Sequence, residues 1–279
     1  MHKILSYEVN SMDSTNTLLL TPVTNIEELV VYHQLRDKTL KEQESFIADS
    51  PKVINEILKT ELHIYSILAT QEYYDEFAPL IEKKQKKQTT PIQLYLATKQ
   101  QMQTVVGHKL HHNAMLHAKR APMVALDALD EHIIMLDAIT STENIGSIAR
   151  SAAALGVRSY LLPSDAPHPY SRRALRVSMG HITKLNYHIY DDIKKTIATL
   201  QQAGYTIFAA EVAKDALKLQ DVNIPKKWVI LMGHEGKGLS QEIIALCDYC
   251  VEIEMSGEVR SFNVGVAASI LMYHFQSKK

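Results

Sequence analysis

The stretch IIMLDAITSTENIGSIARSAAALGVRSYLLP, residues 133–163, contains two short apolar runs separated by a longer segment with helical spacing. The runs at 133–139 and 159–163 are apolar almost throughout, which is typical of strands buried inside a sheet. The segment at 144–156 reads as a helix that ends at Gly156. A strand, a helix and a second strand in this order predict two parallel strands joined by a crossover helix.

The same alternation continues to the end of the chain, so we expect an α/β fold with a mostly parallel sheet covered by helices on both faces. The further elements expected are a helix from Tyr170, a strand at 185–190, a helix at 191–203, strands at 205–211 and 228–233, a helix at 240–247, a strand at 250–255 and a closing helix from Ser261. Together they predict one domain over residues 131–279.

Shorter elements before this domain predict a second, smaller α/β unit. They are a helix at 26–43, a strand at 44–49, a helix at 50–60, a strand at 62–70, a helix over 73–80, a lysine-rich loop, a strand at 92–98, a helix from Lys99 and a strand at 114–119. We therefore expect an N-terminal extension and a small α/β domain within residues 1–119, followed by a linker at 120–130.

The composition is that of an ordinary globular protein, with 46% hydrophobic and 22% charged residues in a chain of 279. No apolar run approaches the ~20 residues that cross a bilayer, and the start has no secretory pattern, so we expect no membrane partner and a cytoplasmic location. Cys247 and Cys250 lack the second pair of ligands that a closed zinc site needs. We expect two reduced, buried cysteines and no metal, with a redox role as the alternative.

The net charge of −1 gives no global preference for nucleic acid, but the basic residues are unevenly distributed. They gather at 83–87, 107–120 and 170–184. Any one of these runs reads most simply as a solvated face, whereas three on one chain suggest a polyanionic partner. The candidate contacts to that partner are Lys119, Arg120, Arg172, Arg173 and Arg176.

Ligands of a parallel sheet gather at the carboxyl ends of its strands, and three of the expected strand ends carry polar residues. After the strand at 133–139 comes Asn144, a candidate helix cap, with Arg150 six residues further on. Arg150 can lean toward the strand end, or it can be a solvated arginine on a capped helix. Gly146 would let another group approach the first turn of this helix.

The second strand end is the loop at 231–240, where Gly233, Gly236 and Gly238 predict backbone amides that are open to a ligand. The loop is neither a GxGxxG nor a Walker motif, so a dinucleotide site or a P-loop lacks support. Glu235 is either a hinge carboxylate bonded to backbone amides or a ligand contact.

The third strand end opens the apolar closing helix with Arg260, Ser261 and Asn263, which are costly to bury unless they are paired. Ser261 is a candidate N-cap, but a cap does not account for the other two residues. If the three strand-end loops converge, their polar groups line a common pocket.

Taken in order, these motifs resemble the SpoU/TrmH-type RNA 2′-O-ribose methyltransferases. The family has an Asn-x-Gly…Arg segment, a Gly-x-Glu-Gly-x-Gly-Leu loop and an Ile-x-Met…Ser-x-Asn-Val segment. The corresponding residues are Asn144 and Arg150, then 233–239, then Ile253, Met255, Ser261, Asn263 and Val264. The N-terminal part resembles, more loosely, the ribosomal-protein-like substrate-recognition domain that often precedes this catalytic domain.

The resemblance implies a C-terminal trefoil knot, a homodimer whose interface helps to build the site, and S-adenosylmethionine as the cofactor. It implies catalytic or orienting roles for Asn144, Arg150, Glu235, Ser261 and Asn263. The cofactor would be bound by Gly233, His234, Gly236, Ile253, Met255 and Phe262.

The activity implied is methyl transfer to a ribose 2′-hydroxyl of RNA, with ribosomal RNA favoured over transfer RNA. Arg150 would hold the adjacent phosphate and the developing alkoxide with its guanidinium fork. The chain departs from the family pattern at 141–143, where Asn-Pro is usual, at His234, where Asn is usual, and at Phe262, where Leu is usual. The alternatives are a non-catalytic RNA-binding factor for ribosome assembly, methyl transfer to a base nitrogen, and a nucleotide-dependent oxidoreductase.

Overall fold

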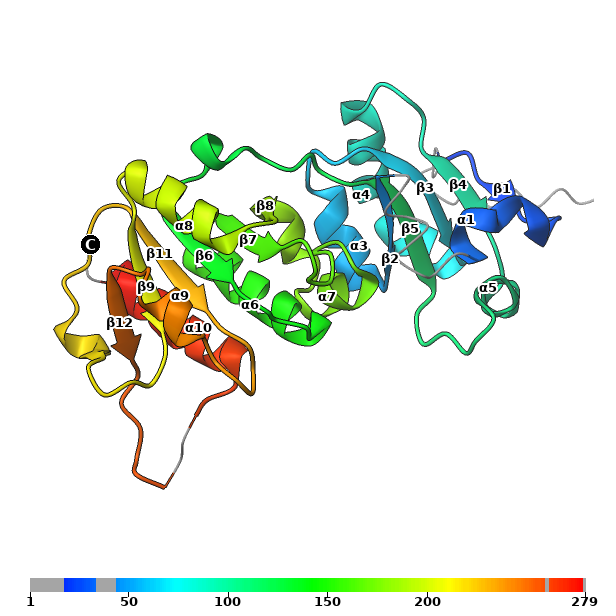
Figure 1. Cartoon of the computed structure of the whole chain (residues 1–279). Coiled ribbons are helices and arrows are strands. Elements are labelled where there is room, and N and C mark those ends of the chain that lie inside the picture. The colour runs from blue at the N-terminus through cyan, green and yellow to red at the C-terminus, as the bar shows by residue number, and fades with distance from the viewer. Residues whose placement is uncertain (1–17, 34–43, 259–260, 278–279) are drawn as a thin grey trace, which may run out of the picture.

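The computed structural model describes residues 18–33, 44–258 and 261–277, which form two sheets lying beside each other (Figure 1). The N-terminal sheet has the strand order β1-β4-β3-β5-β2. β5 pairs antiparallel with both β2 and β3, and the remaining pairs are parallel. The strands are β1 (Thr21–Pro22), β2 (Ser45–Asp49), β3 (Ile64–Ala69), β4 (Gln93–Leu96) and β5 (Ala114–Lys119).

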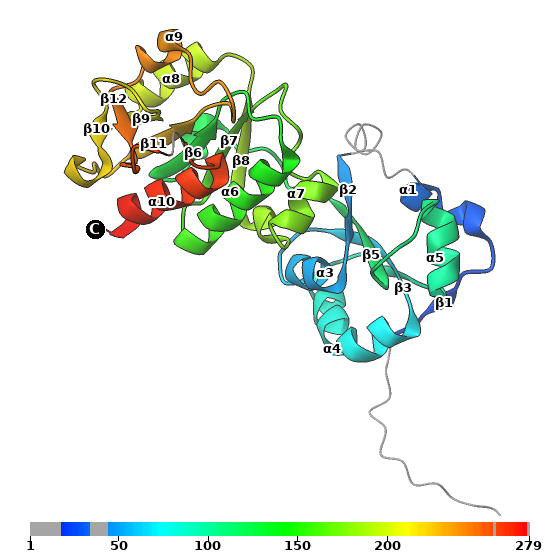
Figure 2. The same cartoon turned by 90° about the horizontal axis from the view of Figure 1, so that it is seen from below.

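Helices cover both faces of the N-terminal sheet (Figure 2). They are η1 (Ile26–Leu29), α1 (Val30–His33), α3 (Pro51–Leu58), α4 (Gln71–Lys87) and α5 (Lys99–Val106). α3 opens with a proline, which tolerates the first helical position, and α5 opens with a capping box between Thr98 and Gln101. Buried residues of α3 and α4 pack on one face, and those of α1 and α5 pack on the other.

The second sheet is parallel in every described pair and has the order β10-β12-β9-β11-β6-β7-β8. Its strands are β6 (His132–Leu136), β7 (Ser159–Pro163), β8 (Asn186–Tyr190), β9 (Thr206–Ala210), β10 (Leu217–Lys218), β11 (Trp228–Met232) and β12 (Tyr249–Glu252). The chain order changes direction at β6, because β7 and β8 lie on one side of it and the later strands on the other. The predicted α/β fold with a mostly parallel sheet is confirmed.

The helices of the second sheet form a layer on each face (Figure 2). One layer holds α6 (Thr142–Leu155), α7 (Arg172–Val177) and α10 (Val264–Ser277), and the other holds α8 (Ile193–Gln202) and α9 (Gln241–Ile244). The short 3-10 turns are η2 (Leu126–Ala128), η3 (His181–Lys184) and η4 (Leu219–Asp221). α7 approaches α6 closely at Gly146, because a Cβ there would lie 2.7 Å from the carbonyl oxygen of Ala174. Because Gly146 has no side chain, α7 can pack closely against α6 at this position.

The two sheets meet through β2 and the segment around α7. Phe46 of β2 packs edge-on against Tyr170, with 4.9 Å between the ring centroids. Asp49, at the end of β2, is only 3% exposed and accepts a hydrogen bond from Nε of Arg176 over 3.1 Å. Buried apolar residues of both sheets belong to one continuous cluster, so the junction is part of the core.

Several predicted bounds are wrong in detail. The lysine run at 83–87 is not a loop but the last turns of α4, and Lys84 is buried with its Nζ donating to the carbonyl oxygen of Thr60 over 2.7 Å. The closing helix begins at Val264 instead of Ser261. Residues 34–43 of the predicted first helix lie outside the described residues. The trefoil knot stays a prediction.

Candidate functional site

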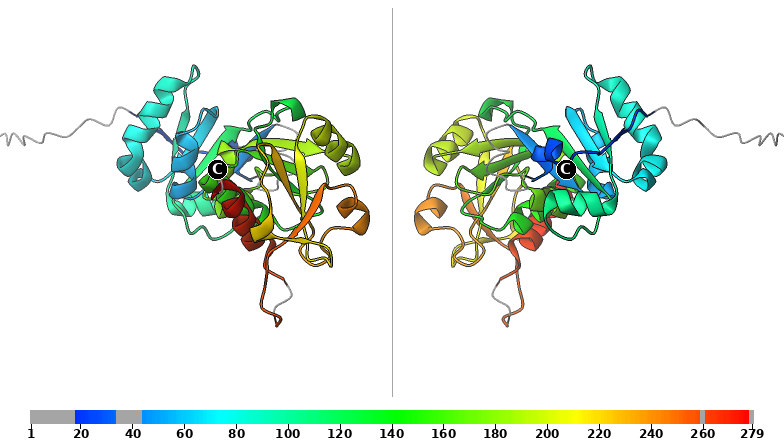
Figure 3. Two further views of the ribbon diagram at one scale, coloured as in Figure 1. Left: turned by 90° about the vertical axis from the view of Figure 1, so that its left-hand side faces the viewer. Right: turned by 90° about the vertical axis from the view of Figure 1, so that its right-hand side faces the viewer.

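A pocket of about 290 Å³ opens at the carboxyl ends of β9, β11 and β12, against one side of α10. Its lining includes every residue that the resemblance assigned to the cofactor: Gly233, His234, Gly236, Ile253, Met255 and Phe262. Glu235 and Ser261 line it as well. The segment that follows β12, residues 253–258, runs away from the sheet and forms part of a projecting loop (Figures 1 and 3). Residues of the second and third motifs therefore line the same pocket.

The loop after β11 is ordered by its own hydrogen bonds. Nδ1 of His234 accepts from the amides of Gly236 and Lys237 over 2.9 and 3.2 Å. The carbonyl oxygen of His234 accepts from the amide of Gly238 over 2.9 Å. The prediction that this loop leaves its amides open to a ligand is thus wrong for these three groups, because each already has an acceptor.

Glu211 completes the loop from the end of β9, and sequence reasoning missed it. Its Oε2 accepts from the amide of Leu239 over 2.8 Å, and its Oε1 accepts from the amide of Val212 over 3.1 Å. Gly238 has φ +64°, and a Cβ there would lie 1.9 Å from Oε2 of Glu211. Glu211 lines the pocket, and its place directly after a buried strand was the one signal that could have found it.

Asn144 connects the three predicted motifs. Its Nδ2 donates to Oε1 of Glu235 over 2.9 Å, and its Oδ1 accepts from Nδ2 of Asn263 over 3.1 Å. The amide of Ser141 also donates to Oε1 of Glu235, over 3.4 Å. Residues far apart in the sequence are therefore tied together beside the pocket.

The carboxylate of Glu235 is stabilised in its charged form. Burial alone would raise its pKa, but hydrogen bonds from Asn144, from its own amide and from Ser141 outweigh that effect and hold the pKa below its usual value. Glu235 therefore links the loop to α6 and accepts backbone amides, as expected for a hinge carboxylate, while it also lines the pocket.

Two predicted helix caps are wrong. Ser141, not Asn144, caps α6, because its side chain accepts from the amide of Asn144 over 3.3 Å. Asn263, not Ser261, caps α10, because its Oδ1 accepts from the amides of Gly265 and Val266 over 2.9 and 3.3 Å. The polar start of α10 thus has two purposes: Asn263 caps the helix and bonds Asn144, and Ser261 lines the pocket. Arg260 lies outside the described residues.

Arg150 is exposed on α6 and is not part of the pocket lining. Arg150 affects His181 of η3, which packs against α6. Burial is the main cause that lowers the pKa of His181, and the charges of Lys184 and Arg150 add to it. Within one chain the structure brings Asn144, Glu235 and Asn263 together and leaves Arg150 outside that group.

The candidate RNA-binding residues lie in different surroundings. Arg172 and Arg176 both pair with Asp49, and Arg173 pairs with Glu143. Lys119 is exposed, whereas Arg120 is only 7% exposed, which leaves little of its side chain for a phosphate. Of the five residues, Arg120 thus offers the least surface to an RNA, and the RNA contacts stay a prediction.

Cys247 and Cys250 carry free thiols and are half-buried. Burial raises the pKa of Cys247 to about 12 and also raises that of Cys250, so neither thiol ionises readily at neutral pH. Within residues 18–33, 44–258 and 261–277, no helix has the length and apolarity to cross a bilayer, and no three His, Cys, Asp or Glu side chains gather as metal ligands would.

Relatives of this chain are named as tRNA/rRNA methyltransferases. An uncharacterized tRNA/rRNA methyltransferase of Mycobacterium bovis is 31% identical over 185 residues, 64% of each chain. A putative TrmH family tRNA/rRNA methyltransferase of Bacillus subtilis is 25% identical over 250 residues, 86% of this chain and 98% of the relative. The chain thus matches less than two thirds of the length of the mycobacterial relative.

Two solved structures share the fold along most of the chain. An AdoMet-bound rRNA methyltransferase from Sinorhizobium meliloti has a TM-score of 0.79 at 19% identity and covers 93% of this chain and 98% of its own. The SpoU methyltransferase AviRb from Streptomyces viridochromogenes has a TM-score of 0.73 at 21% identity, covering 91% and 96%. The model of the SpoU rRNA Methylase family matches residues 131–273, slightly more than half of the chain. The predicted family is confirmed: this chain belongs to the SpoU rRNA methylase family.

Proposed function

We propose that this protein is an S-adenosylmethionine-dependent RNA methyltransferase that modifies a ribose 2′-hydroxyl, with ribosomal RNA as its substrate. The observation that carries the proposal is the pair of hydrogen bonds through which Asn144 joins Glu235 and Asn263 at the edge of the pocket. The names of the relatives, tRNA/rRNA methyltransferases, support the reaction class. The additional N-terminal sheet favours ribosomal over transfer RNA as the substrate.

The pocket suits this cofactor by its polar character. Three loop amides and that of Leu239 already have acceptors, and the lining includes the carboxylates of Glu211 and Glu252, which can accept further hydrogen bonds. S-adenosylmethionine presents donors to such a site: an adenine amino group, two ribose hydroxyls and an ammonium group. Apolar side chains such as Met232 and Leu271 supply the remaining walls.

The protein has to orient the RNA and stabilise the charge that develops on the attacking oxygen. Bound S-adenosylmethionine supplies the electrophilic methyl group. Arg150 stays protonated, so its guanidinium would hold a phosphate and the developing alkoxide while the proton passes to phosphate or water. Ser261 would contact the ribose, and Asn144 with Glu235 would keep the loop and α6 in register.

The site would be completed by a second copy of the chain. α10 leaves two large apolar side chains exposed, Val266 at 47% and Tyr273 at 65%. Arg150 lies outside the pocket lining of its own chain. In a homodimer, the apolar surface of α10 would be covered, and Arg150 of one protomer would reach the pocket of its partner. We propose this arrangement for the active form.

The rest of the chain fits the same proposal. We propose that residues 1–119 form the RNA-recognition part, that 120–130 are the linker and that 131–279 form the knotted catalytic domain, acting in the cytoplasm. Exposed Lys119 and the arginines of α7 would contact backbone phosphates.

The test is methyl transfer from labelled S-adenosylmethionine to ribosomal RNA from cells lacking host methylation, with Arg150→Ala run beside the wild type. We expect label in 2′-O-methylnucleosides, and its loss in the variant. Label in base-methylated nucleosides would contradict the ribose assignment. Tight cofactor binding without label on any RNA would instead favour the non-catalytic RNA-binding factor.

A further inference from the structure

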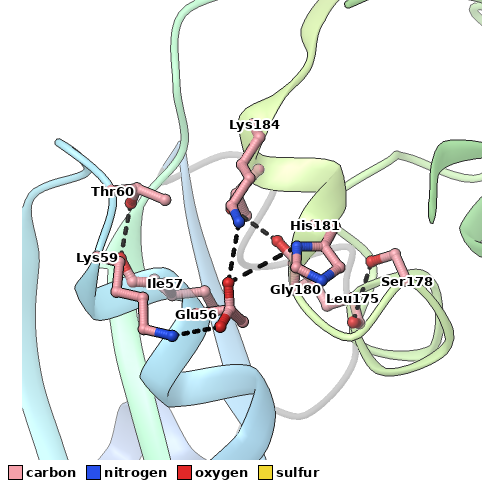
Figure 4. A network of polar contacts seen from close by, with 10 residues as sticks. Glu56, Ile57, Lys59, Thr60, Leu175, Ser178, Gly180, His181 and Lys184 are labelled. Atoms are coloured by element: carbon pink, nitrogen blue, oxygen red, sulfur yellow. Dashed lines mark hydrogen bonds and ion pairs between the residues drawn. The ribbon is translucent and has the colours of Figure 1, made fainter. Parts of the chain in front are cut away.

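Two groups of charged side chains cross the junction of the two sheets, one where α3 faces η3 and one where the end of β2 faces α7. We call them together the junction seam, which consists of Asp49, Glu56, Lys59, Arg172, Arg176, His181 and Lys184. In the first group, Glu56 of α3 accepts from Nζ of Lys59 over 2.5 Å and from Nζ of Lys184 over 2.9 Å, and Nδ1 of His181 lies 3.7 Å away (Figure 4). Lys184 and His181 belong to η3, so this contact joins the two sheets.

The seam has more positive than negative charge. Glu56 is shared by Lys59 and Lys184, and Asp49 is shared by Arg172 and Arg176. Four permanent cations against two carboxylates leave a net charge of +2 on these six residues. The hydrogen bond from Lys59 is the largest cause that lowers the pKa of Glu56, to about 2, so the count holds at neutral pH.

The surplus charge is accessible as well as ordered. The side chains of Lys59, Lys184 and Arg176 keep 55%, 43% and 38% of their surface exposed. Each carboxylate holds two long cationic side chains in place. These side chains therefore lose less conformational entropy when a ligand binds. One cation on each carboxylate is enough to join the sheets. The second cation on each carboxylate therefore adds positive charge that the junction itself does not need.

The seam also lies beside the helix that carries Arg150. η3, which holds His181 and Lys184, packs against α6. A chain of phosphates that crosses the seam would therefore pass from α3, on the N-terminal sheet, toward α6.

We infer that the junction seam is a track for the phosphate backbone of the RNA substrate, so that one RNA strand contacts both sheets. This inference rests on the proposed function, since it identifies how the RNA of that reaction is held. Phosphates are the ligands that match ordered, solvent-facing cations, and each neutralised phosphate releases counterions.

The variant Glu56→Gln distinguishes a phosphate track from a purely structural junction, because only a phosphate track predicts a higher affinity for RNA. A structural junction loses one ion pair across the sheets, so RNA binding falls or stays constant. A phosphate track gains one unit of positive charge, so the affinity for RNA rises, by about threefold at low salt. The probe is a fluorescein-labelled RNA hairpin with a uridine loop, and the readout is fluorescence anisotropy.

Lys59→Gln is the complementary variant. Lys59 pairs with Glu56 inside α3 and does not cross the junction, so its loss leaves the contact between Lys184 and Glu56 in place. We expect weaker RNA binding and a salt dependence whose slope, log K against log [salt], falls by about 0.7 to 0.9 for the lost phosphate contact. The matched controls are Lys194→Gln and Glu242→Gln, an exposed ion pair between α8 and α9 on the other face of the parallel sheet.

The inference stands if Glu56→Gln tightens binding and Lys59→Gln weakens it, while both controls bind as the wild type does. Weaker or unchanged binding by Glu56→Gln overturns it, and so does a Lys59→Gln variant that matches Lys194→Gln. Methyl transfer is measured separately on the same proteins. The expected binding pattern without methyl transfer would reject the proposed reaction alone, and methyl transfer without the pattern would reject the seam alone.

Discussion

His234 shapes the loop at the pocket with one ring nitrogen, which accepts two backbone amides. We expect His234→Ala to weaken S-adenosylmethionine binding about tenfold, since each lost hydrogen bond is worth about 1 kcal/mol and part of that loss is recovered by water. His234→Asn, which restores the residue usual in the family, should stay within about threefold of the wild type because its Oδ1 can accept the same amides. Calorimetric titration measures both, and an alanine variant with unchanged affinity would contradict the assigned role.

His117 gives the N-terminal sheet a predictable response to acid. Burial lowers the pKa of this ring to about 4, and its Nε2 is buried without a hydrogen-bond partner. The unfolded chain therefore binds a proton more readily than the folded protein between pH about 6.5 and about 4. Stability is complete above that window and falls as the pH drops through it.

The variant His117→Gln removes this titration. Between pH about 7.5 and about 5, we expect the wild type to lose roughly 1 kcal/mol more unfolding free energy than the variant, a value discounted for the partial exposure of the ring. Urea unfolding at the two pH values measures the difference. Equal losses in both proteins would show that the ring does not stay neutral on folding.

At the scale of elements, η3 is seated on α3 through Gly180. This residue has φ +81°, and a Cβ on it would lie 3.0 Å from the carbonyl oxygen of Val53. Gly204 has a similar φ of +84° but nothing within 4 Å, so it is a matched control for backbone strain alone. We expect Gly180→Ala to destabilise the protein by about 1 kcal/mol more than Gly204→Ala does, measured by chemical unfolding. Equal destabilisation by the two variants would mean that α3 and η3 can shift apart to accommodate the Cβ without a loss of unfolding free energy.

The sequence predicted the helices and strands better than it predicted the hydrogen bonds between distant side chains. The strand at 114–119 and the strand at 159–163 have the predicted bounds, because a short apolar run between turn signals has few alternatives. The caps of α6 and α10 were assigned to the wrong residues. Asn144 and Asn263 also bond each other across 119 positions, and a single sequence contains no sign of that pairing. The pair of Asp49 and Arg176 is hidden in the same way, 127 positions apart.

For the candidate site, the motif residues that line the pocket were identified by resemblance, and the structure adds what connects them. Glu211 was missed because a carboxylate after a strand is common and carries no motif. The lysines of α4 were taken for a loop because a charge run suggests solvent, yet Lys84 finds a backbone acceptor inside the fold. Local patterns thus predict elements, whereas the tertiary fold decides which polar groups meet.

At the scale of the whole molecule, the position of Arg150 makes the proposed homodimer testable by mixing two inactive variants. Arg150→Ala removes the guanidinium on α6, and Ser261→Ala alters a residue that lines the pocket. If Arg150 serves the partner's pocket, a mixed dimer contains one site with an intact pocket and an intact arginine. Random exchange of equal amounts makes about half of the dimers mixed, each with one of its two sites intact, so about one quarter of the wild-type activity should return.

If Arg150 instead serves the pocket of its own chain, every site in the mixed dimer lacks one of the two groups and the mixture stays inactive. Methyl transfer is measured after unfolding and refolding the two variants together, with each variant refolded alone as the control. Exchange is checked independently by mass spectrometry of differently tagged chains. Recovered activity would mean that two copies of the chain share one reaction centre, because neither α6 nor the pocket of a single protomer would then be sufficient.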